Sequence, residues 1–428
     1  MHKNWKSYKL GDLISYQKGF AFKSDWYKKS GELVVRVSDT TSSSIDISSC
    51  HRIDKDKASA LQRYKLEKDD IVIATVGSWP PNYASVVGKV VKVPSEANGA
   101  LLNQNAVRLK STDETLHSKK YIYYLMKSEY FLKYIVNTAQ GSASQASIKL
   151  TDIFDFKFNI PPLQEQQSIA SILSDIDDKI ENNLAINKTL EEMAMALYKH
   201  WFVDFGPFQD GKFVESELGM IPKGWEVKPF LDLFKLLSGG TPKTTVEDYW
   251  NGDIYWVSAK DIGSNSGGSY INDTEKKITQ LGIDKSAAKI LPEDTVIVVA
   301  RGSVGKFGII AKPMAINQSC YGIYSKSDYS QAVTYLLIKS LMSHFMNVSY
   351  GSVFDTITTS TFQNINILVP PNEIFAEIKN QVDVNFEQIK ENIKENQSLT
   401  QLRNTLLPQL ISGTVRLKEF RETVEEVV

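Results

Sequence analysis

Residues whose types and spacing could do chemistry are few in this sequence. The stretch Trp79-Pro-Pro-Asn-Tyr83 contains the residue types of the Asn/Asp-Pro-Pro-aromatic motif with which amino-methyltransferases hold a target base. Their order differs, because Trp precedes the prolines and Asn separates them from Tyr. No Gly-rich strand-to-helix turn for S-adenosylmethionine accompanies the stretch, and that motif requires this context. We therefore interpret it as a rigid loop.

Patterns for binding nucleotides and metals are missing as well. The sequence has no GxxxxGK[ST] loop, and no Cys or His pair has zinc spacing. Val298–Lys306 contains Gly and Lys but no acidic metal ligands, and a Glu/Asp-x-Lys nuclease core is not evident. The five histidines are scattered: His2, His51, His117, His200 and His344. The sequence therefore predicts a binding protein with no catalytic or metal site of its own.

Length and composition are those of a soluble protein with several domains. The 428 residues exceed one compact core, so two or three domains are expected. We find no apolar run long enough to cross a bilayer, and the opening MHKNWKSYKL lacks the apolar core of a signal peptide. Two cysteines, Cys50 and Cys320, are expected as reduced thiols. We expect a cytoplasmic protein that does not associate with membranes.

The chain repeats itself at the scale of half its length. The halves begin with WKSYKLGDL at residue 5 and WEVKPFLDL at residue 225. KDDIVIATVGS at 68–78 is then matched by EDTVIVVARGS at 293–303, and Leu102-Asn-Gln by Ile316-Asn-Gln. Gly-Ser pairs and hydrophobic-Pro-Pro openings follow in the same order. Matched landmarks in one order predict a tandem duplication.

Each half reads as a β-rich block followed by one very long helix. Short β-branched runs bounded by Gly, Pro, Ser or Asp predict strands, and one helical stretch interrupts each block, at 119–134 and 332–346. No Gly or Pro occurs in 163–205 or in 372–407, so each half closes with a helix of about 60 Å at about 1.5 Å per residue. The predicted divisions are a first β-rich domain 1–160, a helix 161–205, a linker 206–222, a second β-rich domain 223–368, and a helix with a tail 369–428. The fold class is α+β.

The two long helices share a seam with the 3-4 spacing of a coiled coil. Positions from Leu173 to Trp201 recur 209 residues later, and most are apolar in both helices; Asn385 and Arg403 are exceptions, and Phe386 is expected to replace Asn385 at the seam. Asparagines sit at matched positions on both helices: Asn183, Asn187, Asn392 and Asn396.

In an antiparallel coiled coil with pseudo-twofold symmetry, Asn183 faces Asn396 and Asn187 faces Asn392. Buried Asn pairs fix register and orientation at a cost in stability. The alternative is that they lie at the solvent edge of a short seam. We favour the register role.

Charge is polarised along the chain although the net charge is only −1. Residues 1–160 carry 24 Lys and Arg against 16 Asp and Glu, whereas 161–205 carry 3 against 8. One interpretation is that long helices are often acidic; the other is a phosphate-facing surface on the first block. Charge alone leaves both open.

The combination of motifs resembles the specificity (S) subunit of type I restriction-modification systems, over essentially the whole chain. The motifs are a β-rich block, IPPLQEQ at 160–166, a long helix ending LYKHWFVDF at 205, SELGMIPKGW at 216–225, and the pattern again. The second half departs from it, since Asn372-Glu-Ile replaces Leu-x-Glu-Gln. The resemblance implies that each β-rich block is a target-recognition domain for one half of a split sequence in double-stranded DNA.

The resemblance also implies partners and the chemistry that they carry. The helices would be spacer and docking platform for two methyltransferase (M) subunits, which methylate adenine N6 with S-adenosylmethionine. Restriction (R) subunits would add cleavage driven by ATP, with Mg²⁺. This chain would hold none of these cofactors and would serve phage defence as a non-enzymatic recognition subunit.

For DNA contacts we expect loops in which polar, aromatic and basic residues interleave, because Arg and Asn or Gln read base edges while Lys and Ser more often bind phosphate. Trp79 and Tyr83 fit packing on the domain core equally well. In the first domain the candidates are Lys18, Lys23, Trp26, Tyr27, Arg36, Ser38, Asp39, Ser78, Trp79, Asn82, Tyr83, Ser142, Ser144 and Gln145. In the second they are Thr241, Lys243, Thr244, Lys260, Asp261, Arg301, Ser303, Lys306, Ser352 and Asp355.

Two alternatives stay open at the level of sequence. The chain could serve a related system in which methylation and cleavage reside on one partner chain. It could also be a scaffold that holds two β-rich modules on protein ligands, which would show no affinity for DNA.

Overall fold

The computed structural model describes residues 4–415 except for 42, 81, 83–84, 265–267, 327–328 and 351–355. The chain forms two compact units. Unit 1 consists of the described residues of Met1–Asp178 and Leu399–Val428, and unit 2 of those of Lys179–Ser398. Both boundaries fall inside long helices, so each unit contains one section of each helix.

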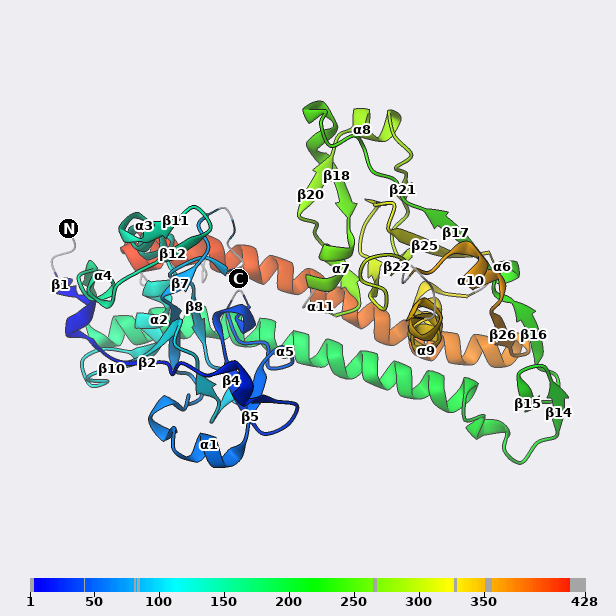
Figure 1. The fold of residues 1–428 in the computed structure, drawn as a ribbon, viewed down its shortest axis with the longest axis horizontal. Helices are drawn as coiled ribbons and strands as arrows, with labels where there is room; N and C mark the ends of the chain where they lie inside the picture. Colours follow the sequence, from blue (N-terminus) through cyan, green and yellow to red (C-terminus); the bar gives the residue numbers. More distant parts are fainter. Residues whose placement is uncertain are drawn as a thin grey trace, which may run out of the picture. The chain divides into compact units, whose positions relative to one another are not determined.

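Unit 1 is built from short strands in small sheets (Figure 1). At its base β1 (Lys6–Lys9) pairs antiparallel with β13 (Lys157–Ile160). A four-stranded sheet has the order β2 (Ile14–Lys18), β10 (Ala106–Ser111), β6 (Ile71–Ala74) and β8 (Val90–Lys92). A second has the order β3 (Tyr27–Lys28), β5 (His51–Ile53), β4 (Glu32–Val35) and β9 (Leu101–Leu102). A third joins β11 (Gln140–Ser142), β12 (Gln145–Ser147) and β7 (Val76–Gly77).

Unit 2 repeats this plan. Here β16 (Glu226–Pro229) pairs with β26 (Asn366–Val369) at the base. The larger sheet has the order β17 (Phe234–Ser238), β25 (Cys320–Ser325), β22 (Val296–Val299), β23 (Phe307–Ile310) and β19 (Tyr270–Ile271). The other has the order β20 (Lys276–Ile278), β18 (Trp250–Val257), β24 (Met314–Ile316) and β21 (Ile290–Leu291).

The correspondence of the two units confirms the predicted tandem duplication. In both, an inner strand of the sheet that contains β6 or β22 is a run of four buried residues, IVIA in β6 and VIVV in β22. A short apolar run with no alternation is what a strand covered on both faces requires. In both, the other four-stranded sheet contains one parallel pair, β4 with β9 in unit 1 and β18 with β24 in unit 2. The fold is α+β, with the β-rich part ahead of a long helix in each half.

Further helices accompany the sheets. In unit 1 they are α1 (Lys55–Ser59), α2 (Lys119–Lys127), α3 (Glu129–Thr138) and α4 (Leu150–Phe154). In unit 2 they are α6 (Phe230–Leu233), α7 (Ala259–Ser264), α8 (Gln280–Asp284), α9 (Gln331–Tyr350) and α10 (Thr359–Gln363).

The single helix expected at 119–134 is wrong. The structure has two helices, α2 and α3, with a break at Ser128, whose backbone is extended. The Ser128 hydroxyl accepts a hydrogen bond from the Phe131 amide, so this serine caps a new helix. The apolar spacing continues across the break because both helices bury one face.

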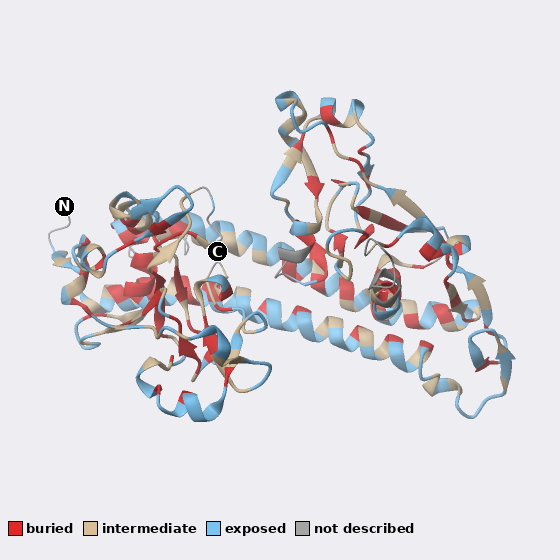
Figure 2. Cartoon of the chain, viewed as in Figure 1, coloured by how far each residue is buried: buried red, intermediate tan, exposed pale blue. Residues whose placement is uncertain are grey.

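The long helices are α5 (Leu163–Phe202) and α11 (Asn372–Ser412). They begin two and three residues after the predicted starts at 161 and 369, and α11 continues through Pro408, past the stretch 372–407 that lacks Gly and Pro. Proline removes one backbone donor and clashes with the preceding turn. At this position the helix has only one further turn to form, so few bonds depend on it. Buried and exposed positions alternate along both helices (Figure 2).

The asparagine pairs meet as predicted. Asn183 Nδ2 donates to Asn396 Oδ1 at 2.9 Å, and Asn392 Nδ2 donates to Asn187 Oδ1 at 2.7 Å. Rising numbers on α5 meet falling numbers on α11, so the two sections in unit 2 run antiparallel. Asn183 and Asn187 are 1% and 3% exposed, which contradicts a place at the solvent edge.

Not every polar atom of these amide side chains makes a hydrogen bond. Among the described residues, Asn183 Oδ1 and Asn187 Nδ2 have no hydrogen-bond partner. An unsatisfied buried polar atom costs about 1–3 kcal/mol, so the pairs oppose stability while they favour one register.

Changing Asn183 and Asn396 together to leucine is therefore expected to raise the unfolding free energy by about 1–2 kcal/mol and to loosen the helix register. Denaturant unfolding measures the first effect. Zero-length cross-linking of Lys179 to Glu395, which lie 3.1 Å apart, reports the second and is expected to fall. Unchanged stability and unchanged cross-linking would remove the register role.

The predicted linker 206–222 contains regular structure. It holds a β-hairpin of β14 (Phe213–Ser216) and β15 (Gly219–Pro222). The start of the second repeat, Trp225, packs against Phe202, Phe205 and Phe208 with ring centroids 5.4–5.6 Å apart. Within the described part of the chain, no helix is long and apolar enough to span a membrane.

Candidate nucleic-acid interface

Two loops of unit 1 bring six of the predicted residues together. Strand β12 pairs with β7, which places the β11–β12 hairpin beside the loop that follows β7. The Trp79 indole N–H donates to the Ser142 carbonyl at 2.8 Å, and Ser78 Oγ donates to the Asn82 carbonyl at 2.8 Å. Asn82, Ser142, Ser144 and Gln145 are exposed. The result is one polar surface made from segments more than 50 residues apart.

A second loop of unit 1 is held by Arg36. Its guanidinium contacts Asp39 through Nη2 at 2.6 Å and Nε at 3.0 Å, and its Nη1 lies 2.7 Å from His51 Nε2. The hydrogen bond to Asp39 raises the pKa of Arg36. Asp39 is 2% exposed, so its contacts are internal, whereas Ser38 beside it is exposed. A DNA contact by Arg36, Ser38 or Asp39 stays a prediction.

The remaining candidates of unit 1 border an aromatic cluster. Trp26 stacks on Phe20 with ring centroids 5.9 Å apart, and Tyr27 lies 4.4 Å from the His51 ring. Lys18 and Lys23 are exposed at the edge of this group. Tyr83 lies outside the described residues. These contacts favour packing for the rings and leave the lysines for an external ligand.

In unit 2 the turn between β22 and β23 carries Arg301, Ser303 and Lys306. Gly302 and Gly305 have φ of 77° and 101°, which favours glycine at these positions and lets the chain reverse tightly. Arg301 and Lys306 are exposed at this turn. The basic pair therefore projects from the end of the central strand.

The other candidates of unit 2 are dispersed. Thr241 hydrogen-bonds the side chain of Gln318, and Lys243 and Thr244 are exposed. Lys260 forms an ion pair with Glu275 at 2.5 Å. Asp261 is 8% exposed and accepts from the Ser258 backbone and the Glu275 backbone at 2.8 and 2.7 Å, so its contacts are internal. Its role toward DNA stays a prediction, and Ser352 and Asp355 lie outside the described residues.

Two groups of cations on aromatic rings escaped the sequence analysis. In unit 2 the Nζ atoms of Lys277 and Lys312 lie 4.3 and 3.9 Å from the ring centroid of Tyr255. Hydrogen bonding to Lys312 is the main cause that lowers the pKa of Tyr255. In unit 1, Lys57 lies 4.8 Å from the Trp26 ring. Interleaved basic and aromatic side chains are typical of nucleic-acid surfaces.

The sequence alone indicates only part of the group around Tyr255. The doublet Lys276-Lys277 is visible in the sequence, but Lys312 joins it only through the pairing of β18 with β20 and β24. In unit 2 Tyr255 lies on β18, whereas in unit 1 Trp26 precedes β3 and Lys57 lies on α1, so both units place a cation on an aromatic ring at or beside the sheet with the parallel pair.

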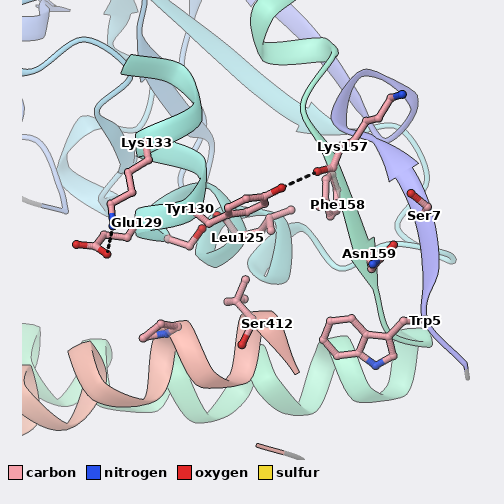
Figure 3. Close-up of a pocket in the computed structure, with 13 residues that line it drawn as sticks. Trp5, Ser7, Leu125, Glu129, Tyr130, Lys133, Lys157, Phe158, Asn159 and Ser412 are labelled. Atoms are coloured by element: carbon pink, nitrogen blue, oxygen red, sulfur yellow. Dashed lines mark hydrogen bonds and ion pairs between the residues drawn. The ribbon is translucent and has the colours of Figure 1, made fainter. Parts of the chain in front are cut away.

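A cavity of about 880 Å³ lies elsewhere in unit 1 (Figure 3). It is bounded by the β1–β13 ribbon, the corner between α2 and α3, and the end of α11, with Trp5, Tyr130 and Ser412 among its walls. The described residues around it include none of the predicted DNA contacts. In unit 2 the matching Trp225 is covered by three phenylalanine rings, as described above. The cavity thus belongs to the base of the unit and not to the loop surface.

Among the residues that the structure describes, no three His, Cys, Asp or Glu side chains are grouped so as to hold a metal ion. Both units present exposed polar or basic residues in loops at strand ends, and a DNA contact by these loops stays a prediction.

A family model for the type I restriction modification DNA specificity domain matches this chain twice, over residues 2–192 and 222–403. The chain belongs to this family. Each match covers one β-rich block and most of the long helix that follows it.

Individual relatives agree with the family match. The HindI specificity subunit of a type I restriction enzyme from Haemophilus influenzae is 27% identical over 67% of this chain and 74% of its own length. The MjaIX specificity subunit from Methanocaldococcus jannaschii is 30% identical over 70% of both chains. The crystal structure of a type I S subunit from M. genitalium superposes with a TM-score of 0.54, at 17% identity, over 96% of this chain and 97% of that one. This last likeness concerns the fold.

The two specificity domains carry different loop chemistry. The first presents amides and hydroxyls at the β7 and β11–β12 loops, and the second presents Arg301 and Lys306 at the β22–β23 turn. Copies of one domain with different loops on matching strands can recognise two different ligands of the same class.

Proposed function

We propose that this chain is the DNA sequence-specificity subunit of a type I restriction-modification system. Each specificity domain reads one half of a bipartite sequence in double-stranded DNA, and the paired helices set the separation of the halves. The observation that carries the proposal is the presence of two family domains in one chain, each with exposed polar or basic loops at its strand ends. Half-site spacing follows protein geometry in such two-domain readers.

The catalytic steps are assigned to partner subunits. Methyltransferase subunits, two per chain, would bring S-adenosylmethionine and methylate adenine N6, and restriction subunits would bring ATP and Mg²⁺. This chain would contribute recognition and docking, without catalysis, in the cytoplasm. Support comes from the family membership and from the absence of nucleotide-binding motifs in the sequence.

The test is to co-express the chain with the methyltransferase encoded beside it and to map N6-methyladenine in the host DNA. The expected result is one split motif, two short half-sites around a fixed gap, that disappears when this chain is omitted. Complex formation without new methylation would overturn the proposal and favour a protein scaffold. A partner that both methylates and cleaves would place the chain in the related fused system.

Trp79 offers a test of the loop surface. Replacing it with phenylalanine removes the hydrogen bond to the Ser142 carbonyl and keeps an aromatic ring, so that the β12–β7 pairing alone holds the two loops side by side. We expect binding of cognate DNA by the methyltransferase complex to weaken about fivefold, which corresponds to about 1 kcal/mol for one hydrogen bond. Binding equal to that of the unchanged chain would show that the link between the loops does not organise the DNA surface.

A further inference from the structure

A partly buried carboxylate joins the second specificity domain to helix α5. Glu191 Oε1 accepts from the Tyr335 hydroxyl at 2.9 Å and from Lys339 Nζ at 2.6 Å, both on α9. Its other oxygen accepts from the Ser269 hydroxyl, just before β19. The Glu191 side chain is 15% exposed. Two separate segments of the domain thus bind one carboxylate on the long helix.

The protonation of Glu191 agrees with this geometry. Burial alone would raise its pKa, but hydrogen bonds from Lys339, Ser269 and Tyr335 outweigh burial, and the pKa is lowered. The carboxylate is therefore charged at neutral pH and accepts from all three donors.

The first specificity domain has a similar junction at another position of α5. Asp177, 8% exposed, accepts from the Tyr124 hydroxyl of α2 and from Arg403 Nη1 of α11, both at 2.8 Å. Lys127 follows one turn after Tyr124, and burial, with repulsion from Arg403, lowers its pKa to about 8. Asp177 thus supplies the negative charge at a point where cations from two helices meet.

The domain helices at these junctions correspond to each other. Helices α2 and α9 both follow a serine whose hydroxyl accepts from the amide three residues on, Ser118 and Ser330. Counted from these serines, Lys127 and Lys339 occupy the same position. Tyrosine precedes the lysine by one turn in both helices, Tyr124 and Tyr335.

The carboxylates themselves do not correspond. The 209-residue repeat relates Asp177 to Phe386 and Glu191 to Thr400. The two halves therefore reach the same chemistry, tyrosine with a cation on a helix carboxylate, from positions that the duplication does not relate. Because the duplication does not relate Asp177 to Glu191, their similar contacts with a tyrosine and a cation were not simply inherited from one ancestral repeat.

We propose that Asp177 and Glu191 are positioning residues that fix the angle of each specificity domain on the helices and thereby restrict the spacer between the half-sites. The inference rests on the proposed function. Apolar packing requires no fixed direction between donor and acceptor atoms, whereas charge-assisted hydrogen bonds have narrow geometry. Buried ion pairs are weak evidence for stability, and fixing one arrangement is their best-attested use.

The geometry of DNA explains why the angle matters. One extra base pair moves a half-site by about 3.4 Å and turns it by about 35°, since the duplex has about 10–10.5 base pairs per turn. A domain held by two or three directed bonds rejects that change. Without these directed bonds, we expect the domain to tolerate that change more readily.

The chain offers matched controls, because each carboxylate has a neighbour of the same type. The test variants are Asp177→Asn and Glu191→Gln. The controls are Asp178→Asn and Glu192→Gln, whose side chains are 57% and 66% exposed. Each variant is co-expressed with the methyltransferase, and the methylated motif is mapped in host DNA.

With the test variants we expect both half-sites to stay the same and methylation to appear at sites whose spacer is one base pair longer or shorter. The ratio of such sites to cognate sites is expected to rise at least tenfold, and the controls are expected to keep one spacer length. Unchanged spacing in both test variants would overturn the inference. A missing motif with the unchanged chain would instead overturn the proposed function.

A milder pair of variants tests the inference if the carboxylate variants do not fold. Tyr124→Phe and Tyr335→Phe keep the rings and remove only the hydroxyls that reach the carboxylates. If the carboxylate variants lose all methylation, the phenylalanine variants decide: relaxed spacing supports the inference, and unchanged spacing contradicts it.

Discussion

Replacing Asp177 with asparagine is expected to lower the stability of unit 1 by about 3–5 kcal/mol, the cost of removing one partner of a buried ion pair. The variant keeps the shape of the side chain but leaves Arg403 and the nearby Lys127 without their anion. Helix α2 packs along α5 through this contact and through Lys120, which lies 3.5 Å from Ser174 Oγ (Figure 1). Losing the central contact is therefore expected to release α2 first.

Hydrogen exchange of the α2 amides, residues 119–127, measures this effect locally, which suits a chain with two units that need not unfold together. Exchange in the Asp177 variant is expected to speed up by at least a hundredfold where it proceeds by opening of this helix. Asp178→Asn is the control. Asp178 is exposed, its nearest cation is Lys92 at 3.8 Å, and such a pair contributes about 0–1 kcal/mol.

A double variant tests whether the loss of protection in α2 comes from the uncompensated charge of Arg403. Removing both partners, with Asp177→Asn and Arg403→Met together, leaves less uncompensated charge than removing Asp177 alone. We expect the double variant to regain at least half of the lost protection. Equal exchange in the two variants would show that Arg403 is not the group that Asp177 neutralises.

The second large effect is a pH dependence carried by Glu191. Its pKa is lowered in the folded chain, so ionised Glu191 contributes stability at all pH values above its unfolded-state pKa of about 4.5. That contribution is lost as pH falls through the folded-state pKa. Glu191→Gln is expected to be about 2–3 kcal/mol less stable than the unchanged chain at pH 7, because hydrogen bonds to a charged group are lost.

The difference between these two chains is expected to hold from pH 7 down to about pH 5 and then to shrink as the pH falls further. Unfolding in urea at a series of pH values, followed by hydrogen exchange of α9, measures it. Glu192→Gln on the exposed side of the same helix is expected to show no such difference. A constant difference from pH 7 to pH 3.5 would mean that the charge of Glu191 is not what the junction uses.

Much of the architecture could be predicted because short-range patterns of apolar and polar residues indicate it and because the second half of the chain repeats them. The asparagine pairs were identified with their correct partners, since a helix period places residues on one face and an antiparallel pairing then determines which of them meet. Phe386 replaced Asn385 in the core, as expected: it is 2% exposed. The strand VIVV and its counterpart IVIA were also recognisable, because a strand covered on both faces must be apolar throughout.

Where helices break or continue was harder to predict, because a local sequence pattern does not show which of two competing interactions is stronger. Ser128 starts a new helix although the apolar spacing runs across it, because a capping hydroxyl outweighs one continued turn. Helix α11 passes through Pro408 because the remaining turn packs in unit 1, where Leu410 and Ile411 are buried. A local cap decided the first case, and tertiary burial decided the second.

The sequence by itself determined the duplication, the long helices, their apolar and asparagine seam, and the class of side chains that the loops offer, since composition and period express these directly. Only the tertiary structure decided which of those side chains act together. Tyr255 meets Lys312, Asp177 meets Tyr124 and Arg403, and Glu191 meets Lys339 across separations of 53 to 226 residues. Hydrogen bonds and cation contacts act over a few ångströms, and the chain spacing of their partners carries no periodic signal. The geometry of the folded chain is what brings them together.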